Sequence, residues 1–118
     1  MLTAWLIAFA FTQAVEVPIY LWATGGRFGV SFLASTLTHP VVWFVFPYAL
    51  LRAELLLGVD FGLPGYVAMV AAAEFFAWLV EGLWLERFGV RRPLLMSLLA
   101  NGSSLSLGLL SRALFDVP

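Results

Sequence analysis

The sequence contains no cysteine and no lysine, and its only histidine is His39. Without cysteine, the chain cannot form a disulfide, a thiolate metal site or a cysteine nucleophile. One histidine excludes bis-histidine haem ligation, but a single axial ligand to haem or to a chlorophyll-type pigment stays open. There is no phosphate-binding loop, dinucleotide fingerprint or His-Glu-x-x-His zinc motif. These absences favour a protein that is not an enzyme, although an intramembrane hydrolase using Ser104 and His39 is conceivable.

Charge is also scarce. Only 11% of the 118 residues are charged, whereas 63% are hydrophobic. Soluble domains have about a quarter charged residues and roughly half apolar ones. The net charge of −1 provides no basic surface for nucleic acid. We therefore predict a multi-pass integral membrane protein whose main partner is the lipid bilayer, and we expect it in the inner (plasma) membrane.

Four apolar segments are each long enough to cross a bilayer, which requires roughly 20 residues. Glycine- and proline-containing loops separate them, because these residues interrupt helices. The first segment lacks a positively charged start and continues past Ala10, so we expect a retained helix rather than a cleaved signal peptide. The sequence predicts one all-α domain over residues 1–118, an antiparallel bundle of four transmembrane helices at about 2–23, 30–51, 66–85 and 94–115.

The arginines suggest an orientation for this bundle. The first and third loops lie on one side of the membrane and carry Arg27, Arg87, Arg91 and Arg92. The opposite side carries Arg52 and Arg112. Because cytoplasmic loops are enriched in basic residues, we expect the loops at Arg27 and at 87–92 in the cytoplasm and both termini outside.

A short repeat connects the two halves. The tetrapeptide Arg-Phe-Gly-Val occurs at 27–30 and again at 87–90, and each copy follows a glutamate, Glu16 or Glu81. Both copies fall on the same side of the membrane. The pattern is consistent with two helical hairpins repeated in parallel about an axis along the membrane normal, as in some membrane folds. A chance match in a biased composition is the alternative.

Polar residues occur at a similar depth in all four segments. With 1.5 Å per residue, Glu16, His39, Glu81 and Asn101 lie roughly 10–15 Å from their cytoplasmic helix ends. Lipid offers such groups no hydrogen bonds, so these faces should meet inside the bundle. Neighbours on the same helix faces complete this polar layer: Gln13, Tyr20, Ser35, Thr38, Glu74 and Ser104. We predict that Glu16 pairs with His39, and that Glu81 pairs with Asn101 and Ser104.

Two functional hypotheses follow. The small size and many apolar aromatics slightly favour a non-catalytic subunit of a larger membrane complex, in which polar residues only hold helices together. The alternative is an oligomeric channel or transporter for protons or ions, because intramembrane ionisable residues are commonly functional. For that alternative the candidate residues are Glu16, Thr38, His39, Glu74, Glu81, Asn101 and Ser104. Glu16, His39 and Glu81 are also candidate metal ligands. Partners would be copies of the chain or other membrane subunits, and the sequence identifies no cofactor.

Overall fold

The structure is a computed structural model that describes residues 2–116, and these residues form helices without any strand. Four stretches are long and apolar enough to cross a membrane. They comprise α1 (Leu2–Thr24), a composite second span, α4 (Gly62–Arg87) and α5 (Pro93–Phe115). The predicted all-α bundle of four transmembrane helices is therefore confirmed. Helix α5 begins one residue before its predicted start, whereas α4 begins four residues before its predicted start.

The second span is longer than predicted and changes character along its length. It consists of α2 (Phe28–Pro40), the π-helical segment η1 (Val41–Val45) and α3 (Phe46–Leu57). Pro40 has no amide hydrogen to donate to the carbonyl of Thr36, and the π-helical segment begins at the next residue. Such insertions in an α-helix are often found at functional sites. Gly58 then ends the span in a left-handed conformation with φ 64°.

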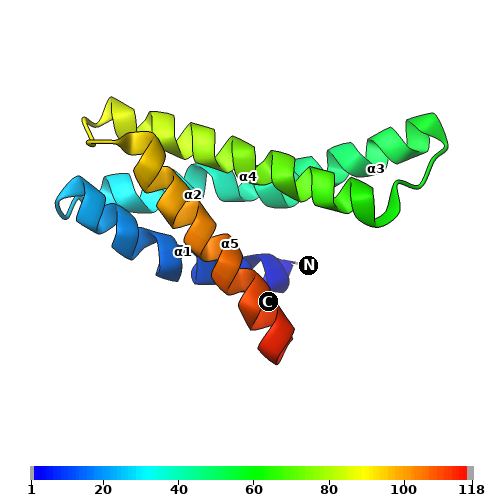
Figure 1. The fold of residues 1–118 in the computed structure, drawn as a ribbon, viewed down its shortest axis with the longest axis horizontal. Coiled ribbons are helices and arrows are strands. Elements are labelled where there is room, and N and C mark those ends of the chain that lie inside the picture. The colour runs from blue at the N-terminus through cyan, green and yellow to red at the C-terminus, as the bar shows by residue number, and fades with distance from the viewer. Residues whose placement is uncertain (1, 117–118) are drawn as a thin grey trace.

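The helices gather at one end and diverge at the other (Figure 1). At the gathered end lie the turns after α1 and after α4. Toward the opposite end, α5 crosses away from α4, and the α3–α4 hairpin extends to one side. Contacts link α1 with α2, α2 with α4, α4 with α5, and α5 with α1. The four helices thus surround a common interior.

Small residues allow close packing at the gathered end. A buried cluster contains Tyr20, Ala34, Leu85, Val90 and Ala100. Hydrogen bonds join the hairpins there: the Arg27 guanidinium donates to the carbonyl oxygen of Phe88 (2.8 Å), and the indole of Trp84 donates to that of Val30 (3.0 Å). This end of the bundle is closed by packed side chains.

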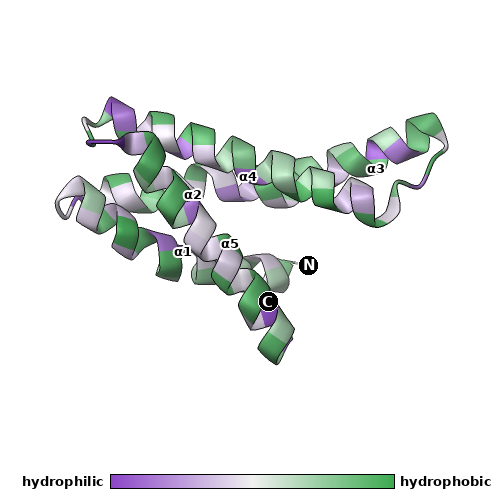
Figure 2. Cartoon of the chain, in the orientation of Figure 1, coloured by the Kyte–Doolittle hydropathy of each residue, from purple (hydrophilic) through white to green (hydrophobic). Residues whose placement is uncertain are grey.

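Large hydrophobic residues are exposed on every helix, and Figure 2 shows hydrophobic stretches along all the helices of residues 2–116. None of the residues of α3 is buried, and Leu55, Leu56 and Leu57 are each at least 66% exposed. A soluble domain would bury such leucine side chains away from water. In a membrane they can stay on the surface, because lipid covers them. The chain is accordingly a multi-pass membrane protein.

Candidate functional site

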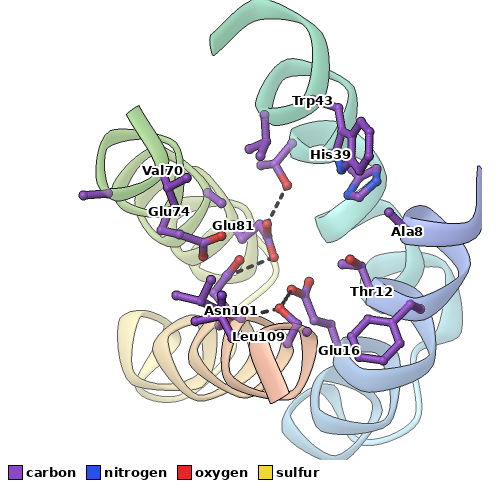
Figure 3. A pocket seen from close by; sticks show the side chains of 18 of the residues that line it. Ala8, Thr12, Glu16, His39, Trp43, Val70, Glu74, Glu81, Asn101 and Leu109 are labelled. Atoms are coloured by element: carbon purple, nitrogen blue, oxygen red, sulfur yellow. Dashed lines mark hydrogen bonds between the residues drawn. The ribbon is translucent and has the colours of Figure 1, made fainter. Parts of the chain in front are cut away.

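A cavity of about 560 Å³ lies between the diverging helices. Its inner end is polar and includes Glu16, Glu81, Asn101 and Ser104. The outer part is lined mainly by apolar residues of α1, η1, α4 and α5, among them Phe11, Val42, Trp43, Val67, Val70, Leu105 and Leu109. Arg112 lines it near the end of α5. Figure 3 shows the carboxyl groups of Glu16 and Glu81 in the space between the helices.

Glu16 is only 2% exposed and receives two hydroxyl groups from two other helices. The Oγ atom of Ser35 on α2 donates to Oε2, and the Oγ atom of Ser104 on α5 donates to Oε1 at 2.5 Å. The predicted pair with His39 is wrong, because the hydrogen bonds of Glu16 go to these serines instead. Ser35 was not among the predicted site residues, although it shares a helix face with His39, four residues away.

Glu81, which is 1% exposed, has three donors. The Tyr20 hydroxyl donates to Oε1 at 2.5 Å, the Thr38 hydroxyl to Oε2 at 2.5 Å, and the amide of Asn101 to Oε1 at 3.3 Å. The predicted Glu81–Asn101 contact is therefore present. The Ser104 hydroxyl, in contrast, donates to Glu16 and not to Glu81 as predicted.

Tyr20 is a site residue that the candidate list did not include. It is fully buried, and its hydroxyl lies 3.4 Å from the Asn101 amide nitrogen, which donates to it. Its position four residues after Glu16 placed it on the polar face of α1. A tyrosine near a helix end is more commonly a membrane-interface anchor, so Tyr20 was assigned to the polar layer but not to the functional candidates.

The two glutamates have corresponding surroundings. Each receives a donor from the second helix of its own hairpin: Ser35 for Glu16 and Asn101 for Glu81. Each also receives a donor from the second helix of the other hairpin: Ser104 for Glu16 and Thr38 for Glu81. Exchanging the hairpins therefore maps one set of contacts onto the other. The matching donors lie at different distances from the two Arg-Phe-Gly-Val turns, because Ser35 follows Arg27 by 8 residues and Asn101 follows Arg87 by 14, so the parallel repeat stays a prediction.

His39 lies apart from both carboxyl groups. Its ring is 5.3 Å from that of Phe9, 5.9 Å from that of Trp5 and 6.1 Å from that of Trp43, measured between centroids. The imidazole is 7% exposed, and its Nε2 atom is buried without a hydrogen-bond partner. His39 nevertheless lines the same cavity as the glutamates (Figure 3).

Glu74 occupies an intermediate position in the cavity wall. It lies seven residues before Glu81 on α4, which corresponds to roughly 10 Å along the helix axis. Its carboxyl group points toward the interior in Figure 3. The cavity thus presents a third acidic group between its apolar outer part and the two buried glutamates.

The arrangement is a poor match for a metal centre. Within residues 2–116, no group of three or more histidine, cysteine, aspartate or glutamate residues is placed to hold a metal ion. The candidate ligands His39, Glu16 and Glu81 therefore do not form one cluster. What the site offers is a pair of carboxyl groups surrounded by hydroxyl and amide donors.

Comparisons with known proteins add no relationship. No family model matches the chain, and neither the curated proteins nor the solved structures contain a significant match.

Proposed function

We propose that this protein exchanges protons or small cations within the membrane, using Glu16 and Glu81. The observation that carries the proposal is that both buried carboxyl groups line one cavity without a basic partner. Among the described residues, the donors to these groups are hydroxyl and amide groups, and Glu16 and Glu81 are also hydrogen-bonded to each other. Arg112, the one arginine lining the cavity, lies eight residues beyond Ser104, roughly 12 Å along α5.

The lack of a basic partner matters because a buried negative charge needs compensation. A carboxylate in the middle of a membrane helix costs about 2.5–3.5 kcal/mol on insertion scales. Two negative charges in the same buried site would add their mutual repulsion, because the low dielectric screens them poorly. Hydroxyl donors stabilise a carboxylate but cannot neutralise it. The site therefore needs a proton or a bound cation, and exchange between the two is the chemistry that it supports.

A purely structural role would not require a cavity. Polar residues that only join transmembrane helices can meet in a closed interface, where they contribute about 0.6 kcal/mol each. Glu16 and Glu81 make interhelical hydrogen bonds of this kind, but they also line a cavity of about 560 Å³. Glu74 adds a further acidic group between the two glutamates and the outer part.

The packed end of the bundle favours a carrier over an open channel. Beyond the glutamates, the cluster around Tyr20 and Leu85 fills the interior up to the two turns. A continuous water path would have to cross this packed region. Passage would thus require a second conformation or a pathway formed in an oligomer, and alternation between two conformations is the common solution in transporters.

Proton flux into proteoliposomes is the direct test. A pH-sensitive dye inside the vesicles would report uptake driven by an imposed potential. We expect flux with the unaltered protein and none with the double variant Glu16→Gln/Glu81→Gln. The matched control is Glu86→Gln, which changes an exposed acid at the turn end of α4. Equal flux through the double variant and the control would overturn the proposal.

A role as a subunit of a larger membrane complex is the second candidate. It is supported by the α3–α4 hairpin, which extends beyond the other helices in Figure 1, and by α3, which has no buried residue. Native mass spectrometry after gentle extraction would distinguish the two. A stoichiometric larger partner would favour the subunit role, whereas a homo-oligomer would favour exchange by the protein alone.

A further inference from the structure

The hydrogen-bonding capacity of the two glutamates points to a class of ligand. A carboxylate has about four acceptor positions on its two oxygens. Glu16 uses one position on each oxygen for Ser35 and Ser104 and is hydrogen-bonded to Glu81 through a proton, so about two positions are free once that proton leaves. Glu81 uses three positions, for Tyr20, Thr38 and Asn101, so about one stays free. The inner end of the cavity therefore offers about three unused acceptors.

These unused acceptors belong to groups that carry negative charge when ionised. A primary ammonium ion has three N–H donors and one positive charge, and a quaternary ammonium ion has the charge without any donor. Charge and donor number together thus favour a primary ammonium group beside Glu16 and Glu81. A transition-metal ion fits less well, because the described residues contain no group of three histidine, cysteine, aspartate or glutamate side chains placed to hold one.

His39 adds an unsatisfied polar group to the wall of the cavity. Its Nε2 atom is buried without a partner, although His39 lines the cavity and its residue is only 7% exposed. A buried polar atom left unpaired is unfavourable, because the hydrogen bonds that it loses to water are not replaced. A donor brought in by a ligand, or a water that accompanies it, would relieve this cost.

The rest of the cavity is suited to an apolar body. From the glutamates outward its wall includes Ala71, Val70 and Val67 on α4, and Leu105 and Leu109 on α5. A volume of about 560 Å³ lies within the range of small-molecule sites. Apolar walls with a few polar groups at one end are typical of sites that orient an amphiphilic ligand.

We infer that the cavity binds primary alkylammonium ions, with the ammonium group between Glu16 and Glu81 and the alkyl chain between α4 and α5. This inference rests on the proposed exchange function and names the cation. Binding of the ammonium would displace the proton that compensates the glutamates when the site is empty. The protein would then exchange a proton for an amphiphilic amine.

The test uses the full chain in lipid nanodiscs and isothermal titration calorimetry, with empty nanodiscs subtracted. The probes are hexylammonium, hexyltrimethylammonium and hexanol, which share one alkyl chain. We expect hexylammonium to bind at least tenfold more tightly than hexyltrimethylammonium, and hexanol not to bind. Repeating the titration in buffers of different ionisation enthalpy should reveal proton release on binding. Equal affinity for the two cations, or no binding of hexylammonium, would overturn the inference.

Variants locate the binding and separate the two proposals. Glu16→Gln should weaken hexylammonium binding at least tenfold, whereas Glu86→Gln should not change it. Because Glu16→Gln keeps an acceptor and the shape of the side chain, its thermal unfolding should match that of the unaltered protein. If Glu16→Gln did not fold, Glu16→Asp would be tested in its place. Proton flux without hexylammonium binding would contradict the inferred class of ligand but would not contradict the proposed exchange function. Hexylammonium binding that Glu16→Gln leaves unchanged would place the amine elsewhere and overturn the inference.

Discussion

Glu16 and Glu81 hold corresponding positions in the two hairpins, yet their surroundings differ in one respect. Glu16 is held by two serine hydroxyls. Glu81 is held by a threonine and an amide at the matching positions, and it has the Tyr20 hydroxyl in addition. The extra donor comes from α1, so Glu81 connects three other helices, whereas Glu16 connects two.

This difference separates two roles within one site. A serine hydroxyl that loses its acceptor can turn to a carbonyl oxygen of its own helix, and Ser104 already lies 3.1 Å from the Asn101 carbonyl. The Tyr20 hydroxyl is fixed at the end of a rigid ring and has no such choice. We therefore expect Glu81 to contribute more to stability and Glu16 more to exchange.

The largest effect should come from Glu81→Leu. This change leaves the buried Tyr20 hydroxyl without its carboxylate acceptor, at a cost of about 1–3 kcal/mol, and it also removes one acceptor of Asn101, whose amide still donates to Ser97. We expect a loss of about 3 kcal/mol in the free energy of unfolding. Reversible unfolding in lipid or mixed micelles would measure it, with Glu16→Leu as the matched variant. If Glu16→Leu were as destabilising as Glu81→Leu, the two roles would not be separable.

Next in size is the loss of proton flux in Glu16→Gln. The single variant removes the ionisable group that keeps the larger unused acceptor capacity, so we expect flux at least tenfold below that of the unaltered protein. Glu81→Gln should lower flux as well, but it should also lower the unfolding temperature, because the amide cannot accept all three donors of the carboxylate. Vesicle flux and thermal unfolding on the same preparations would check the distinction. A reversed order of the two variants would contradict it.

A smaller effect is expected from Tyr20→Phe. The substitution keeps the ring and removes the one donor that distinguishes the two sites. Hydrogen bonds to charged groups contribute about 1.5–3 kcal/mol and neutral ones about 1 kcal/mol, so we expect a loss of about 1–2 kcal/mol in stability. Tyr48→Phe, at a 61% exposed position, is the control. Equal stability of the two variants would mean that the Tyr20–Glu81 hydrogen bond contributes nothing measurable.

The smallest effect should be that of Ser104→Ala. Interhelical hydrogen bonds in membranes average about 0.6 kcal/mol, and Ser35 continues to donate to Glu16. We expect a stability loss of about that size, measured against Ser106→Ala at an exposed position of the same helix. Destabilisation as large as that of Tyr20→Phe would show that the Glu16 site is as rigidly built as the Glu81 site.

Several features of the site follow directly from sequence reasoning. Glu16, Glu81, Asn101, Thr38 and Ser104 meet as predicted, because polar groups in a membrane helix must find partners on neighbouring helices. The pairing within the layer was predicted less well. His39 was predicted at a depth similar to that of Glu16, but depth does not fix rotation about the helix axis, and the imidazole lies among Trp5, Phe9 and Trp43 instead.

The π-helical segment after Pro40 is another feature that the sequence predicts only in part. The missing amide of Pro40 identifies where the helix is irregular. It does not specify how the backbone compensates, because a kink and an inserted residue both accommodate the lost hydrogen bond.

The sequence by itself determined the class of protein, the number of membrane-spanning stretches and the position of each polar residue along its helix. Apolar length and the demand for internal backbone hydrogen bonds in lipid allow few other solutions. Only the tertiary structure decided which donors reach which carboxyl group and that a cavity extends from Glu16 and Glu81 between α4 and α5. These features depend on the rotation and crossing of whole helices, which many weak side-chain contacts determine together and no local sequence pattern records.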